Sequence, residues 1–167
     1  MHKNGFTLIE LIVVVAIIGI LAMIGIVAFN GFIERTRDTV LKRNHEIVLR
    51  FIATKAMECE LGSDSITFKD EFGNNNVSYS CRSTDKADFA NKLRVHVNNN
   101  ICENVYRPDR GCLEITGGYL EEVITVDVNT GLSQCAIFVR TFPAQALNPE
   151  TFSTGYGGKV FFMPSWC

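Results

Sequence analysis

Three residues near the start of the chain have types and spacing suited to chemistry: a glycine, a phenylalanine and a glutamate. Gly5 ends a short polar leader, Phe6 follows it, and Glu10 lies just inside an apolar segment. The uncharged run from Leu11 to Phe29 spans roughly 28 Å as a helix, close to the ~30 Å hydrocarbon core of a bilayer. Because a carboxylate in such a segment is costly in lipid, we interpret Glu10 as a functional residue.

The motif Gly5-Phe6-Thr7-Leu8-Ile9-Glu10, followed by the apolar run, resembles the start of a type IV pilin or of a related pseudopilin. The resemblance implies that a prepilin peptidase cleaves after Gly5 and that Phe6 becomes the N-methylated first residue. It also implies that Glu10 pairs with the N-terminal amine of a neighbouring subunit during filament assembly. The resemblance covers residues 1–30, and the remaining residues are interpreted on their own.

Glu10 has two interpretations. As a membrane-edge residue it extends its carboxylate to water, whereas as an assembly residue it is the charge partner of the Phe6 amine on an adjacent subunit. That amine exists only after cleavage, so processing and assembly would be linked. Because desolvation partly cancels the attraction of a charge pair in a low dielectric, such a pair is better explained by subunit register than by net stability. The surrounding motif favours the assembly interpretation.

Six cysteines follow the apolar run, and none lies within it: Cys59, Cys81, Cys102, Cys112, Cys135 and Cys167. An even number in this part of the chain indicates an oxidising compartment and three disulfides. We favour sequential pairing, Cys59–Cys81, Cys102–Cys112 and Cys135–Cys167, among the many connectivities that the sequence leaves open. The last pair is implied by the resemblance, because pilin-like domains commonly tie a late strand to the C-terminal segment. A zinc site is the weaker alternative, since no Cys-x-x-Cys pair occurs.

Composition places one domain beside the membrane segment in this chain of 167 residues. The formal net charge is −2, and removal of Lys3 with the leader would leave 15 basic and 18 acidic residues, a charge of −3. No basic excess points to nucleic acid, so nothing beyond a weak local contact with it is expected. The apolar run is not a secretory signal, because the expected cleavage site precedes it.

The apolar run is expected to continue as one long amphipathic helix. Ile33, Val40 and Ile47 recur every seven residues on one face, with charged residues at other positions. The helix is expected to end near Gly62, which gives a length on the order of 80 Å, too long for one small domain to cover. Whether the helix melts locally between Gly19 and Gly25 is left open.

The segment after the helix is polar and rich in turns. Ile66–Phe68 and Val77–Cys81 are expected as short strands, and Asp85–Val97 as a short helix that Asn98-Asn99-Asn100 then ends. Phe89, Leu93 and Val97 recur every four residues in that helix, and His96 lies beside them.

The last third is expected to form antiparallel strands. Cys112–Thr116 is a candidate strand, and Leu120–Val128 with Leu132–Arg140 gives the clearest hairpin signal in the chain. Thr141–Gly158 is expected as a long loop and Lys159–Met163 as a final strand.

These patterns predict an α+β fold in which a long N-terminal helix packs on a small antiparallel β-sheet, as in pilins. The expected parts are a leader (residues 1–5), a membrane or filament-core helix (6–30) and a head domain (31–167). Within the head we expect the second half of the helix (31–61), a connecting region (62–111), and the sheet with its C-terminal disulfide loop (112–167).

The sequence does not indicate an enzyme, a cofactor or a metal site. Neither Gly-x-Ser-x-Gly nor His-Glu-x-x-His occurs. His45 lies among charged residues and is expected to be solvated. Asp64, Asp70 and Glu71 are the strongest candidates for calcium ligands, but they lack the spacing of a calcium-binding loop.

The resemblance therefore implies a structural subunit. It would be held in the bacterial inner membrane as a precursor, processed by a prepilin peptidase, and polymerised with copies of itself by pilus assembly machinery into a surface filament for adhesion, motility or DNA uptake. Two alternatives remain open: a pseudopilin of a type II secretion system, and a membrane-anchored binding module that does not polymerise.

Overall fold

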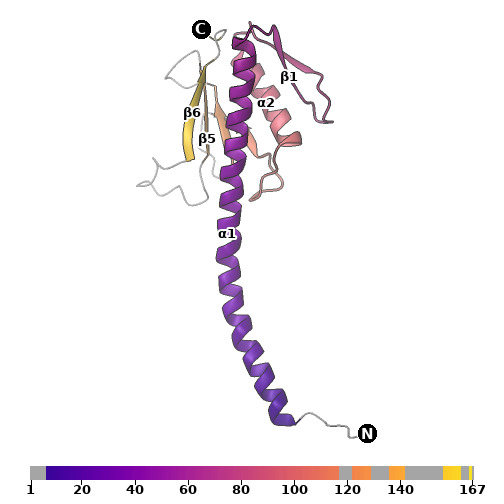
Figure 1. Ribbon diagram of the computed structural model, residues 1–167, viewed down its shortest axis with the longest axis vertical. Helices are drawn as coiled ribbons and strands as arrows, with labels where there is room; N and C mark the ends of the chain where they lie inside the picture. Colours follow the sequence, from indigo (N-terminus) through magenta and orange to yellow (C-terminus); the bar gives the residue numbers. More distant parts are fainter. Residues whose placement is uncertain (1–6, 117–121, 129–135, 142–155, 163–165, 167) are drawn as a thin grey trace. The chain divides into compact units, whose positions relative to one another are not determined.

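The computed structural model describes residues 7–116, 122–128, 136–141, 156–162 and 166. The chain divides into two compact units, Met1–Arg37 and Asp38–Cys167. One helix, α1 (Leu8–Glu60), begins in the first unit and ends in the second (Figure 1).

Helix α1 ends where the sequence predicts. Gly62 adopts a positive φ of 95°, and its N–H donates to the Cys59 carbonyl, while the Ser63 N–H donates to the Glu58 carbonyl. These two bonds form a Schellman motif, which satisfies carbonyls that the last turn of a helix leaves open.

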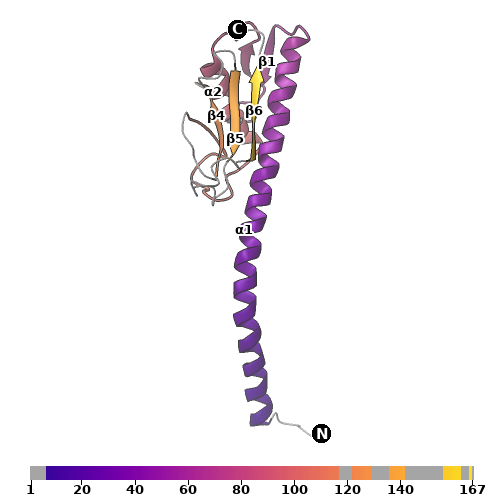
Figure 2. The same ribbon diagram turned by 90° about the vertical axis from the view of Figure 1, so that its left-hand side faces the viewer.

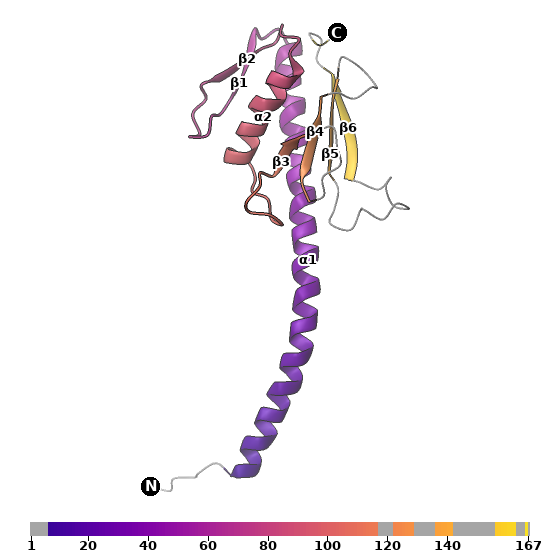
Figure 3. The same ribbon diagram turned by 180° about the vertical axis from the view of Figure 1, so that it is seen from behind.

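The second unit contains a two-stranded sheet and a second helix after α1. Strand β1 (Ser65–Phe68) pairs antiparallel with β2 (Val77–Ser80). Helix α2 (Lys86–Asn100) follows, and the Asp85 side chain caps it by accepting the Asp88 N–H. Figures 1 and 3 show α2 between this hairpin and the second sheet.

Helix α2 extends over the three asparagines that were expected to end it. The Asn98 side chain accepts the Leu113 N–H and donates to the Leu113 carbonyl, and the Asn100 amide donates to the carbonyls of His96 and Asp70. The expected end at Val97 is therefore wrong. Contacts of the Asn98 and Asn100 side chains outweigh the weak helix propensity of asparagine.

The second sheet has four strands in the order β3 (Leu113–Ile115), β4 (Ile124–Asp127), β5 (Ala136–Thr141) and β6 (Tyr156–Phe162). The last three strands run antiparallel, which confirms the predicted hairpin pairing, and Figure 2 shows them side by side. Strand β3 pairs parallel with β4, so the antiparallel expectation is wrong for this pair. Leu113 is opposite Ile124, which means that the chain returns to the starting end of β3 before β4 begins.

The final strand also differs from the prediction. Strand β6 begins at Tyr156 rather than Lys159, and Thr141 belongs to β5. The connection between the strands is therefore shorter than the expected loop, and its residues 142–155 lie outside the described residues.

The core of the second unit lies where α1, α2 and both sheets meet. Helix α1 contributes a buried stripe that includes Leu41, Val48 and Ile52, and these pack with side chains of the sheets and α2 such as Phe68, Phe89, Leu93, Ile124 and Ile137. The long helix with small sheets confirms the predicted α+β, pilin-like fold class.

Candidate functional site

The start of α1 is organised by Thr7 and Glu10. The backbone N–H and the hydroxyl of Thr7 both donate to Glu10 Oε2, at 2.8 and 2.7 Å, and the Glu10 N–H lies 3.4 Å from the Thr7 hydroxyl oxygen. This reciprocal arrangement is a capping box, which satisfies orphan donors in the first turn of a helix. Thr7 was missed in the sequence as a functional residue, although its signal, Thr-x-x-Glu before an apolar run, is local and readable.

The capping box uses one oxygen of the Glu10 carboxylate. Among the described residues, Oε1 accepts no hydrogen bond, and the side chain is exposed. Glu10 is therefore oriented by its own chain while retaining an oxygen for another donor. The expected cleavage site, Gly5 and Phe6, lies immediately before this box and outside the described residues.

Behind the box, α1 presents an apolar surface in the first unit. Its large hydrophobic side chains are exposed, from Leu8 at 75% through Met23 at 74% to Phe32 at 64%. By length and composition the helix is apolar enough to cross a membrane. Such a surface is unfavourable in water, so lipid or other apolar helices are its natural surroundings.

Three glycines lie along this surface. A Cβ added at Gly19, Gly25 or Gly31 would meet no atom within 4 Å, so each leaves open space beside the helix. Small residues of this kind let a neighbouring helix approach closely in an apolar medium. Helix α1 is continuous through Gly19 and Gly25 in this structure.

Among the described residues, two disulfides close loops in the second unit. Cys59 at the end of α1 is bonded to Cys81 after β2, with Cα atoms 5.3 Å apart, and Cys102 is bonded to Cys112, with Cα atoms 6.0 Å apart. These are two of the three pairs in the favoured sequential connectivity. The third, Cys135–Cys167, lies outside the described residues.

His45 is not solvated, contrary to the expectation. It is buried on the core face of α1, and its Nδ1 lies 2.7 Å from the hydroxyl of Thr141 in β5. The neighbouring charged residues Arg43 and Glu46 are exposed on other faces of the helix, so their presence in the sequence did not indicate the environment of His45.

His96 is also buried. It stacks on Phe51 with ring centroids 4.5 Å apart, and its Nδ1 accepts the Lys69 N–H at 2.9 Å. Burial, reinforced by the positive charges of Lys69 and Lys55, lowers the pKa of His96 below its ordinary value. Both histidines thus serve the packing of the head.

Two of the three acidic residues considered for calcium have partners of another kind. Asp64 pairs with Arg82 at 2.9 Å, and Asp70 accepts hydrogen bonds within its own loop. Among the described residues, no group of three or more His, Cys, Asp or Glu side chains is placed to hold a metal ion.

Comparison with known proteins identifies the N-terminal segment. Residues 1–26 match the family model described as the prokaryotic N-terminal methylation motif, which is the type IV pilin-type signal. The match confirms the resemblance to type IV pilins and pseudopilins for this segment, and it implies processing by a prepilin peptidase. No curated protein and no solved structure matches the chain.

Proposed function

We propose that this chain, whose precursor carries the type IV pilin-type signal, is a structural subunit of a type IV pilus. The observation that carries the proposal is the combination, at one end of α1, of the methylation motif, the Thr7–Glu10 capping box and an exposed apolar helix surface. The subunit is cleaved after Gly5, N-methylated at Phe6 and polymerised with copies of itself.

The geometry suggests that the two carboxylate oxygens of Glu10, in the first turn of α1, have different roles. Thr7 holds Glu10 Oε2, so the carboxylate keeps a fixed orientation while Oε1 remains available for a cation. Cleavage creates such a cation, the amine of Phe6, and the proposal assigns the pairing partner of Glu10 to the Phe6 amine of a neighbouring copy. An unpaired carboxylate among apolar helices disfavours every packing that leaves it without a cation, which selects subunit register.

The exposed surface of α1 supports the same proposal. The exposed side chains from Leu8 to Phe32 would be covered by lipid before assembly and by the helices of other copies afterwards. Open space beside Gly19 and Gly25 suits close helix packing. We therefore assign residues 6–30 to the membrane and filament core, 1–5 to the leader, and 31–167 to the head.

The head supports an extracellular location. Disulfides form and persist in oxidising compartments, and the two that the structure describes in this head join cysteines 22 and 10 residues apart. The proposed course runs from the bacterial inner membrane, through processing and assembly, to a filament on the cell surface that serves adhesion, motility or DNA uptake. Its role is structural rather than catalytic.

The direct test of processing is the intact mass of the protein recovered from a host that has a prepilin peptidase and assembly machinery. The expected mass lacks Met1–Gly5 and includes one added methyl group on Phe6. A mature protein that begins at Met1 would refute processing.

The test of assembly replaces Glu10 and compares filaments sheared from the cells. Glu10→Leu is expected to keep membrane insertion and to abolish filaments, whereas Glu34→Gln, at an exposed glutamate of the same helix, is expected to form them normally. Mass spectrometry of the filaments and of any secretion-system pseudopilus shows which structure contains the chain. If the protein is instead a monomer in detergent and Glu10→Leu changes nothing, the result would support a membrane-anchored binding module that does not polymerise.

A further inference from the structure

The loop between β1 and β2, residues 69–76, presents an aromatic side chain to the outside. Phe72 is 80% exposed, and the neighbouring Glu71 is also exposed. Figures 1 and 3 show that the hairpin carrying this loop lies on the far side of α2 from the four-stranded sheet. A single exposed hydrophobic residue is ordinary on a protein surface, so the conformation of the loop around it is the informative feature.

Asp70 fixes the backbone on both sides of Phe72. Its Oδ1 accepts the N–H groups of Phe72 and Asn74, each at 2.9 Å, and its Oδ2 accepts the Asn76 side-chain amide at 2.7 Å. The Asn100 amide donates to the Asp70 carbonyl at 3.0 Å, which ties the loop to α2. The loop backbone is therefore pre-organised and would lose little conformational entropy on binding.

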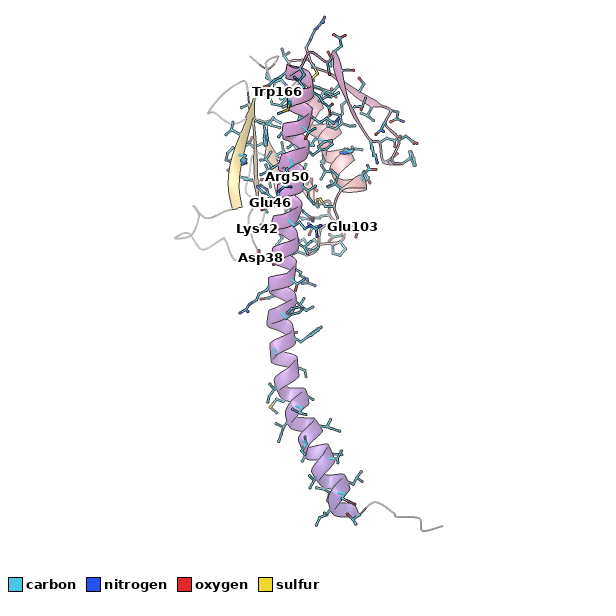
Figure 4. The ribbon with its side chains drawn as sticks, viewed as in Figure 1. Asp38, Lys42, Glu46, Arg50, Glu103 and Trp166 are labelled. Carbon is cyan, nitrogen blue, oxygen red and sulfur yellow. A yellow bond between two sulfur atoms is a disulfide. The ribbon has the colours of Figure 1, made fainter. Side chains whose placement is uncertain are left out.

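A surface of complementary character lies on α1. Arg50, Ala53 and Met57 are spaced at i, i+3 and i+7, so they form one strip along an exposed side of the helix. All three are exposed, Met57 by 59%. Ala53 has the smallest side chain of the three and lies between the two longer ones along the helix, and Arg50, labelled in Figure 4, makes no ion pair among the described residues.

We infer that the 69–76 loop of one copy docks on the Arg50–Ala53–Met57 strip of a second copy in the filament. The Glu71 carboxylate would pair with the Arg50 guanidinium, and the Phe72 ring would cover Ala53 and contact the Met57 thioether. Arginine and carboxylate make strong, directional pairs, and a methionine sulfur packs well against an aromatic ring. This inference rests on the proposed function, because it supplies a head-to-head contact for the polymer.

Two features of the surfaces favour a repeated contact between copies. The loop and the strip are different surfaces of one chain, so a contact between them is heterologous and can continue from copy to copy, as a filament requires, rather than end at a pair. Glu46, one turn before Arg50 on α1, is exposed and would repel Glu71 if the loop were displaced by a turn (Figure 4). The charges therefore define a register as well as an attraction.

The first test places a photo-crosslinking residue, p-benzoylphenylalanine, at position 72 of the full chain and irradiates assembled filaments. The expected product is a crosslinked dimer whose second peptide includes Ala53 or Met57. The same residue at Leu61, which is 81% exposed, controls for indiscriminate crosslinking and is expected to give a different peptide. No dimer from position 72, or a dimer through another segment, would overturn the inference.

The second test exchanges charges across the proposed contact. Glu71→Arg and Arg50→Glu are each expected to lower the yield of sheared filaments about two- to fivefold, in line with an exposed ion pair, and the double variant is expected to restore it. Glu60→Arg and Arg43→Glu serve as controls at exposed charges of α1 outside the strip. Single variants with wild-type yields, or a double variant no better than either single, would overturn the contact.

The outcomes separate this inference from the proposed function. If Glu10→Leu abolishes filaments but neither charge reversal changes their yield, the pilus assignment stands and the proposed contact is refuted. If the wild-type chain forms no filaments, both the pilus assignment and the proposed contact are refuted. Crosslinking of position 72 to an unrelated protein, with no dimer, would assign the loop to a different partner and would also overturn the contact between copies.

Discussion

The indole N–H of Trp166 donates a hydrogen bond of 3.0 Å to the hydroxyl oxygen of Tyr79, and both side chains are buried. The Tyr79 hydroxyl lies 3.1 Å from the carbonyls of Ser83 and Asp85, which accept from it. The Trp166 ring also meets Phe89 edge to face, with centroids 5.3 Å apart. The penultimate residue of the chain is therefore fixed to the first hairpin and to α2.

Trp166→Ala is expected to destabilise the head by about 3–5 kcal/mol, because a large buried side chain is removed and a cavity is left. Trp166→Phe is expected to cost less, about 1–3 kcal/mol, since it retains the aromatic contact and loses the hydrogen bond and part of the ring. Urea unfolding of the full chain in detergent, followed by circular dichroism, measures both. Phe72→Ala, at an exposed site, is the control. Equal midpoints for Trp166→Ala and wild type would contradict this role.

His96 makes the stability of the head sensitive to acid. Burial and the positive charges of Lys69 and Lys55 lower the pKa of His96 in the folded state below the ordinary value of 6.5. The unfolded chain then binds the proton more readily, so the contribution of His96 to stability is complete above pH 6.5 and is lost as the pH falls through the folded-state pKa. We expect wild type to lose stability on acidification from pH 7 to pH 5, and His96→Gln to lose less. Parallel pH profiles of the urea midpoint for the two proteins would contradict the assignment.

The sequence correctly predicted those helix ends and strands that depend on residues close together in the chain. Gly62 predicted the end of α1 because a left-handed C-terminal residue favours glycine, and the alternation in Ile124–Asp127 predicted a strand with an antiparallel partner. His45 was misjudged because its partner, Thr141, is distant in the sequence, and only the folded sheet brings the two together. The parallel pairing of β3 with β4 likewise depends on tertiary packing.

In the candidate site, too, the sequence indicated the local motif but not the features that depend on the fold. Gly5, Phe6 and Glu10 stand in a motif that can be read directly, and the motif match covers them. The exposure of Phe72 and the hydrogen bonds that Asp70 makes around it follow from the fold of one loop, and no periodic pattern marks them. Surface loops are therefore where sequence reasoning was least informative.

Each of the two described disulfides is expected to stabilise the head by restricting the unfolded chain. In the loop-entropy model, sequence separations of 22 and 10 residues correspond to about 3 kcal/mol each, with the larger value for Cys59–Cys81. Paired serine replacements, Cys59→Ser with Cys81→Ser and Cys102→Ser with Cys112→Ser, test them separately by urea unfolding. Hydrogen exchange is expected to rise in the last turn of α1 only in the first variant, since Cys59 lies in that turn and neither Cys102 nor Cys112 does. A rise in both variants would contradict this local role.

The capping box predicts that Thr7 positions Glu10 for assembly through its hydroxyl. Thr7→Ser keeps the hydroxyl and is expected to form filaments near the wild-type yield. Thr7→Val keeps the shape but loses one of the two hydrogen bonds to Oε2, so its filament yield is expected to fall several-fold. Hydrogen exchange in detergent is expected to show faster exchange at Leu8–Glu10 for valine and not for serine. If the valine variant frays the helix start yet assembles normally, Thr7 only caps the helix. If valine assembles poorly while the helix start is unchanged, the orientation of the Glu10 carboxylate is what assembly requires.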